Sequence, residues 1–184
     1  CTLAVLLAFA WAPPPAAAQD SHVLVIVGLA GEPEIAGEFH RWASTLVDAA
    51  RQRYGLPAES VIYLGEDPSR DALRISDRST SANIQASIDK LAARARPGDR
   101  VFVVLIGHGA TATGAPRFNL PGPDLAAKDF AVLLDRFKAQ SVTLVNTASA
   151  SGGYVAALSG RDRTIITATR TDGVGFTASP PSGW

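Results

Sequence analysis

The chain has 184 residues, 47% of them apolar and 18% charged, and its 17 basic side chains balance its 17 acidic ones. This length suits a single domain with a proper core. The zero net charge argues against nucleic-acid binding, and the low charge without heptads argues against a coiled coil or a disordered chain.

The first 18 residues predict a secretory signal peptide. Residues 3–12 form an unbroken apolar run, and three prolines and residues 16–18, all alanine, follow it. Ten apolar residues are too few for a bilayer, which needs about 20. We therefore expect cleavage after Ala18, export to the periplasm or the medium, and no membrane attachment afterwards. The alternative is a short anchor or a buried N-terminal helix.

Two counts bear on this segment. The chain has no methionine, so we expect the basic start of the signal peptide to be missing. Its one cysteine is Cys1, so the exported chain would contain none. We therefore expect no disulfide and no thiol chemistry after export.

Strand-like and helix-like segments alternate from residue 22 onward. Apolar, β-branched runs predict strands, and apolar residues at helical spacing predict helices. In the first helix, we expect the apolar stripe to face the core; its members are Ile35, Phe39, Trp42, Leu46, Val47 and Ala50. The expected strands are 22–28, 60–64, 100–106, 141–145 and 164–168, and the expected helices are 35–54, 84–95, 124–137 and 152–158.

Some connecting segments also carry predictions. The polar segment 65–78 and the Gly- and Pro-punctuated segment 110–123 are expected to be loops. Asp124 is expected to cap the third helix, and one of residues 79–81 the second.

This alternation predicts a doubly wound, three-layer α/β/α sandwich. Its strands are apolar throughout, which is typical of a parallel sheet covered on both faces. We assign residues 19–171 to this domain and 172–184 to an irregular or truncated tail. The site of such a fold lies beyond the carboxyl ends of the strands, here residues 28–31, 107–109 and 146–153.

His108 is the first candidate site residue. It lies between Gly107 and Gly109 directly after a strand, where it is uncrowded enough to serve as a general base. The alternative is a loop histidine without a role. We expect His22 to be exposed at the start of its strand, and His40 to be structural.

A serine-rich turn, residues 147–153, follows the fourth strand. A nucleophile here, Ser149 or Ser151, would lie beside the amides of a helix start, which can stabilise an oxyanion. The alternatives are a helix cap and an anion nest for a phosphate or small molecule. A phosphate-binding P-loop fails because no lysine follows the glycines, and an α/β-hydrolase fails because no histidine follows the serine.

A buried strand ending in Gly-His-Gly, followed by a strand ending near x-Ser-x-Ser-Gly-Gly, resembles the caspase and legumain superfamily of cysteine peptidases (clan CD). Residues 163–170 are similar to the next strand of its bacterial members. The resemblance implies a caspase-like fold and a peptide or protein substrate. It makes His108 the dyad histidine and places Ser149 where the cysteine stands. The amides of Gly109 and Ser149 would form the oxyanion hole, with loop support from Gly107, Ser151, Gly152 and Gly153.

The serine is a departure from that pattern, and Thr147 replaces the usual acidic residue. A serine hydroxyl needs a well-oriented base, and no carboxylate stands at motif spacing. We therefore expect a pseudopeptidase that binds peptide or protein. The alternatives are an active Ser–His peptide hydrolase and a small-molecule or anion-binding domain.

No further ligand is predicted. No residues have the spacing of a metal site, and residues 28–31 are expected to form a tight turn without a nucleotide, so we expect no metal and no cofactor. Homodimerisation along an open sheet edge is a further prediction.

Overall fold

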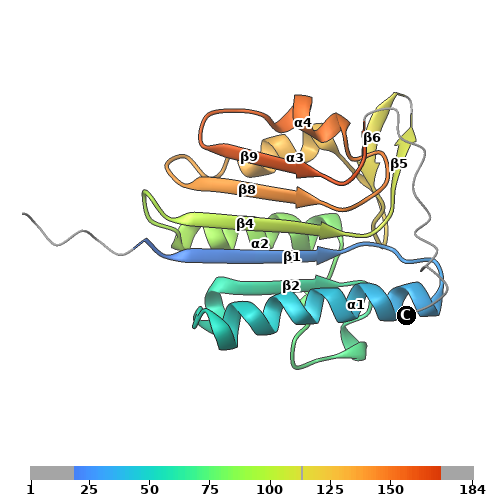
Figure 1. Cartoon of the computed structure of the whole chain (residues 1–184), viewed down its shortest axis with the longest axis horizontal. Helices are drawn as coiled ribbons and strands as arrows, with labels where there is room; N and C mark the ends of the chain where they lie inside the picture. The colour runs from blue at the N-terminus through green and yellow to red at the C-terminus, as the bar shows by residue number, and fades with distance from the viewer. Residues whose placement is uncertain (1–18, 113, 171–184) are drawn as a thin grey trace, which may run out of the picture.

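The centre of the fold is a six-stranded sheet in which every strand is parallel to its neighbours (Figure 1). The computed structural model describes residues 19–112 and 114–170; the predicted signal peptide and the tail lie outside them. The strand order is β3-β2-β1-β4-β8-β9. These strands are β1 (Ser21–Val27), β2 (Val61–Gly65), β3 (Asp77–Arg78), β4 (Arg100–Ile106), β8 (Ser141–Asn146) and β9 (Arg163–Thr167).

Within the described residues, four α-helices cover this sheet unequally. They are α1 (Pro33–Asp48), α2 (Ser81–Arg94), α3 (Ala127–Leu134) and α4 (Gly153–Leu158). Helices α2, α3 and α4 share one large apolar core with one face of the sheet, whereas α1 packs on the other face over β1 and β2 (Figure 1). The predicted three-layer α/β/α sandwich is confirmed.

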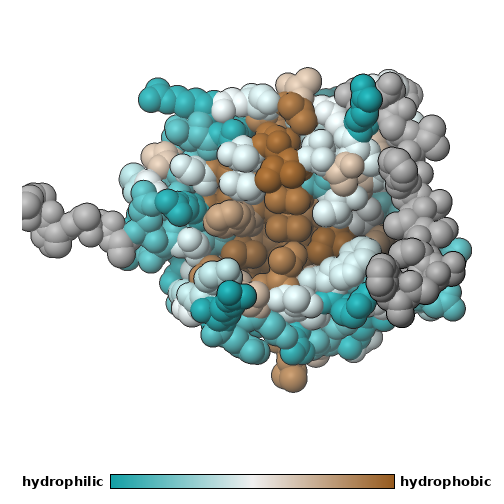
Figure 2. Space-filling model, in the orientation of Figure 1, coloured by the Kyte–Doolittle hydropathy of each residue, from teal (hydrophilic) through white to brown (hydrophobic). Residues whose placement is uncertain are grey.

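The face that α1 shares is only partly covered. Phe102 of β4 and Ile166 of β9 are 37% and 51% exposed, although parallel strands are normally buried on both faces. Figure 2, which views the molecule from the α1 side, shows an apolar patch running across this face. The sheet has β3 and β9 at its edges, and homodimerisation along an open edge stays a prediction.

The first helix buries a different set of apolar residues from the set predicted. Phe39, Ala43 and Val47 face the core, whereas Trp42 and Leu46 are 44% and 42% exposed. Two apolar stripes run side by side along α1, and only one of them meets the sheet. The helix ends at Asp48 and continues as a wider π-turn over Ala49–Arg53.

The expected loop 110–123 is instead part of a small antiparallel sheet, β5-β6-β7. Its strands are β5 (Gly109–Ala112), β6 (Ala115–Phe118) and β7 (Leu125–Ala126). The expected cap Asp124 is also wrong: its carboxylate accepts the N–H of Leu120 at 3.0 Å. The helix begins at Ala127, where Asp129 accepts the N–H of Ala126 at 2.8 Å.

His22 is buried rather than exposed. Its side chain is 2% exposed, and its Nε2 lies 3.2 Å from the carboxylate of Asp99. Burial alone would raise the pKa of Asp99, but hydrogen bonds from the N–H of Arg96, from the His22 ring and from the N–H of Asp20 hold it below its ordinary value. This pair therefore ties the start of β1 to the turn before β4.

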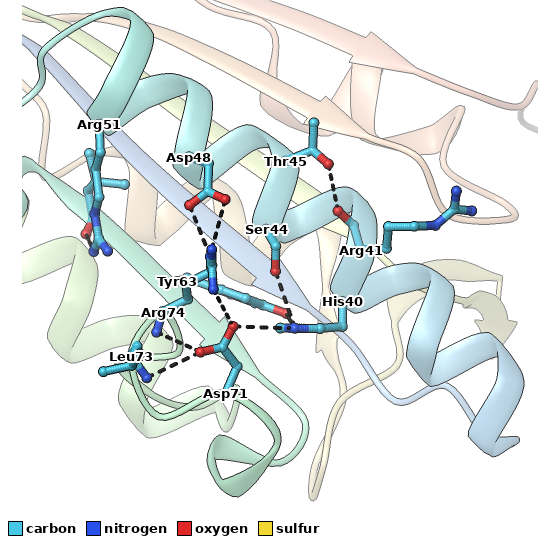
Figure 3. A network of polar contacts seen from close by, with 11 residues as sticks. His40, Arg41, Ser44, Thr45, Asp48, Arg51, Tyr63, Asp71, Leu73 and Arg74 are labelled. Atoms are coloured by element: carbon cyan, nitrogen blue, oxygen red, sulfur yellow. Dashed lines mark hydrogen bonds and ion pairs between the residues drawn. The ribbon is translucent and has the colours of Figure 1, made fainter.

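His40 belongs to a polar network that fastens the segment after β2 to α1 (Figure 3). Its Nδ1 lies 3.1 Å from the hydroxyl of Tyr63, and its Nε2 lies 3.5 Å from the carboxylate of Asp71. Arg74 bridges Asp71 to Asp48 of α1, at 3.0 and 2.9 Å. Burial raises the pKa of the Tyr63 hydroxyl, which therefore stays protonated in this network. These contacts give His40 the structural environment that we expected.

Candidate active site

The parallel pairing of β4 and β8 brings His108 and Ser149 to the same edge of the sheet. Leu105 pairs with Asn146, and the two candidate residues each stand three positions beyond their member of that pair. Both line one groove at the carboxyl ends of the strands. The structure therefore brings together the histidine and the serine that the sequence singled out.

The loops that carry these two residues touch. A Cβ atom on Gly109 would overlap the carbonyl oxygen of Ser149 and lie 2.9 Å from that of Arg117. A Cβ on Gly107 would lie 3.0 Å from the ring of Phe118. Both glycines flanking His108 are therefore needed for close approach of neighbouring chain segments.

The His108 side chain is exposed and rests against an aromatic ring. The centroids of its ring and that of Phe39 are 5.3 Å apart, at an interplanar angle of 60°. Within residues 19–112 and 114–170, no carboxylate hydrogen-bonds this imidazole. The ring is thus positioned by packing on α1.

Two hydrogen bonds shape the start of the serine loop. The side chain of Asn146 accepts the N–H of Ala148 at 3.0 Å, and the hydroxyl of Thr147 donates to the carbonyl of Leu105 at 2.9 Å. Ala150, directly after Ser149, has a φ of 55°, in the region that favours glycine. Such strain costs of order 1–3 kcal/mol and persists only where the surroundings impose it.

Ser151 is the buried anchor at the other end of this loop. Its hydroxyl lies 3.0 Å from that of Thr169, and its N–H also donates to the Thr169 hydroxyl, at 2.9 Å. The N–H of Thr169 completes the clamp by donating to Ser151, at 3.2 Å. Of the two serines considered as nucleophiles, only Ser149 lines the groove.

The glycines after Ser151 lead into α4. A Cβ on Gly153 would lie 2.7 Å from the ring of Pro116, so this glycine lets the β5–β6 hairpin pack on the start of the helix. Gly152 has helical dihedral angles and precedes α4, which is six residues long. The anion-nest alternative at 149–153 stays a prediction.

The N–H of Gly109 faces away from the small sheet. Asn119 donates its N–H to the carbonyl of His108 at 3.0 Å, so these two residues form a hydrogen-bonded pair. Gly109 pairs with Phe118 at the next position of this antiparallel ladder, where N–H groups point outward. This amide is therefore free of the ladder, as an oxyanion donor beside His108 must be.

The groove beside these residues is large and apolar. Its volume is about 910 Å³, and among the described residues that line it Glu38 is the only carboxylate, with no lysine or arginine beside it in the lining. The apolar spacing of α1 predicts that this wall lies in the core, because hydrophobic spacing does not distinguish a buried stripe from an apolar groove wall. The apolar lining comprises Ile35, Phe39, Trp42 and Leu46 of α1 together with Val104, Ile106 and Val145 of the sheet.

A second, smaller cavity lies at the ends of β1 and β2. Its volume is about 270 Å³, and its lining includes Glu32, Glu66, Asp67 and Arg70. No cluster of three or more metal-ligating side chains occurs in the described part of the chain. No helix within those same residues is long and apolar enough to cross a membrane.

Comparison with known proteins identifies the family. A sequence model of the Peptidase C13 family matches residues 48–182, which include His108, Ser149 and five of the six strands of the main sheet. No curated protein matches the chain. The parallel six-stranded sheet between helices agrees with the caspase-like fold that the resemblance implied. The chain belongs to the Peptidase C13 family.

Proposed function

We propose that this chain is a pseudopeptidase, which binds a peptide or protein at the ends of β4 and β8 and has Ser149 in place of the catalytic cysteine. The observation that carries this is the environment of His108. Its ring packs on Phe39, and it donates no hydrogen bond to any described carboxylate. A serine nucleophile depends on an oriented base. In serine peptidases, loss of the orienting aspartate lowers kcat by about 10⁴-fold.

The backbone of the site supports binding in the absence of fast cleavage. The amides of Gly109 and Ser149 would donate to a peptide carbonyl oxygen, and the apolar groove would hold the flanking side chains. The contact between Gly109 and Ser149 keeps the two amide-bearing loops together. The ligand would thus occupy the position of a peptidase substrate.

A second candidate is an active Ser–His hydrolase. In its favour, Ser149 lines the same groove as His108, and within the described residues no hydrogen bond occupies its hydroxyl. In that reaction, Ser149 Oγ attacks the peptide carbonyl carbon and His108 takes the hydroxyl proton. His108 then returns the proton to the leaving amine, and water hydrolyses the acyl-enzyme.

Export is part of the same proposal. The apolar run of residues 3–12 and the small residues 16–18 support it, and the protein would then meet its ligand outside the cytoplasm.

The deciding experiment compares peptide binding, peptide hydrolysis and fluorophosphonate labelling in the wild type, Ser149→Ala and His108→Ala. We expect the wild type to bind peptides without hydrolysing them and to remain unlabelled. Labelling of the wild type that Ser149→Ala and His108→Ala both abolish would overturn the proposal in favour of the hydrolase. Ser159→Ala, an exposed serine at the end of α4, is the matched control.

A further inference from the structure

The groove beside the dyad has an α1 wall that the described chain leaves open. Trp42 and Leu46 form this wall, and Val104 and Val145 of β4 and β8 form its floor. The wall lies outside the segment that matches the Peptidase C13 family. Large aromatic and aliphatic side chains that are half exposed in a concave site are typical binding anchors.

We propose that this groove selects a peptide with a large apolar side chain next to a cationic group, an inference that rests on the proposed function. The groove is continuous with the site because His108 and Ser149 are among the residues that line it. A peptide carbonyl held there would place a neighbouring side chain against Trp42. The volume of about 910 Å³ is ample for a phenylalanine or leucine side chain with adjoining backbone.

The charge of the lining determines the second part of the preference. Glu38 is exposed, and within the described residues its one ion pair is with Arg41, a marginal 4.0 Å away, where the two side chains are 49% and 69% exposed. A lysine, an arginine or an N-terminal amine beside the apolar side chain would therefore meet an available carboxylate. An acidic residue there would be repelled.

The floor and the wall also explain why a polar side chain is a poor occupant. Val104 and Val145 offer no hydrogen-bond donor or acceptor from their side chains, and the ring of Phe39 lies beside the rings of both Trp42 and His108. A carboxylate or amide placed against these two valines would lose its water without gaining a partner from them, which is costly. An aromatic or branched aliphatic side chain loses nothing of that kind.

The test measures anisotropy of fluorescein-labelled hexapeptides with the full chain. One position is Phe, Leu, Asn or Asp, and its neighbour is Lys or Glu. We expect the Phe and Leu peptides to bind about tenfold or more tightly than the Asp peptide, and Trp42→Ala to remove this preference. Tyr54→Ala, which removes an exposed aromatic side chain outside the groove, should leave it unchanged.

The charge preference has its own variant and control. In the wild type, we expect the Lys peptide to bind roughly two- to fivefold more tightly than the Glu peptide, and Glu38→Lys to reverse this order. Glu34→Lys, an exposed carboxylate one turn earlier in α1 that does not line the groove, should preserve it. Urea unfolding of each variant checks that the fold is retained.

The outcomes separate this inference from the proposed function. Binding that ignores both the variable residue and Trp42→Ala overturns the inference alone. Failure of every peptide to bind overturns both. A dimer, detected by sedimentation, that Trp42→Ala dissociates would show that a second copy fills the groove. Apolar peptides that bind only after Phe176→Ala would show that the chain's own segment 171–184 fills it. Either result overturns the inference.

Discussion

Replacing Gly109 by alanine tests the contact on which the site depends. The added Cβ would overlap the carbonyl oxygen of Ser149, and it would lie 2.9 Å from the carbonyl oxygen of Arg117. Neither obstacle is the far end of a flexible side chain, because both are backbone atoms. One of the two loops must therefore move for the residue to fit.

The expected cost follows from the two overlaps. Overpacking of a well-packed site costs about 1–3 kcal/mol, and backbone obstacles place this site at the upper end, near 3 kcal/mol. With a urea m-value of about 2 kcal/mol per molar, the unfolding midpoint should fall by about 1.5 M. Peptide binding should weaken at least tenfold because the Ser149 loop is displaced from His108.

The control is another glycine of the same chain. Gly37 lies within α1 and has nothing within 4 Å of an added Cβ, so Gly37→Ala should stabilise the protein by about 0.5–1 kcal/mol. Urea unfolding and peptide anisotropy are measured for both variants. If Gly109→Ala unfolds within 0.5 kcal/mol of the wild type and binds peptide normally, the two loops do not meet as described.

Two further predictions concern the supports of the site and of the sheet. Thr169→Val removes the hydroxyl from a clamp of three hydrogen bonds with Ser151 and should lower the free energy of unfolding by about 1–3 kcal/mol. Thr169→Ser, which keeps the hydroxyl, should retain most of the wild-type stability. Equal stabilities of Thr169→Val and the wild type would contradict the clamp. The second prediction concerns the stability of the protein at low pH. Because the pKa of Asp99 is lower in the folded than in the unfolded chain, the unfolded chain binds the proton first, and stability is lost as the pH falls below about 4. Urea unfolding between pH 5 and 3 should show a shallower loss in Asp99→Asn, and parallel curves would refute this.

The central strands could be predicted because their signal is local. Residues 100–106 and 141–145 are continuous apolar runs, and both form strands of the parallel sheet with nearly the expected bounds. The placement of His108 and Ser149 at one edge follows from those strands being neighbours. That adjacency is a property of the fold class, which apolar strands alternating with helices indicate.

The sequence does not predict the hairpin at residues 109–118, because the stability of this hairpin is not local. It contains glycine and proline and shows no clear alternation, and it is held by pairing with β7 and by close packing of Gly109 and Gly153 on distant segments. The burial of His22 cannot be predicted from its own segment for a similar reason, since its partner Asp99 lies far along the chain. Hydrophobic periodicity predicts that Trp42 lies in the core, because it identifies an apolar stripe but not what covers that stripe.

The most direct test of the dyad is the pH dependence of alkylation in Ser149→Cys, made in a Cys1→Ser background so that the chain has a single thiol. A thiol beside an imidazole reacts as a thiolate well below the ordinary pKa of about 8.5. We predict that the introduced thiol titrates at least about one unit below that value, and that adding His108→Ala returns it to about 8.5. Identical profiles with and without His108 would contradict the account, because the two side chains would then not face each other.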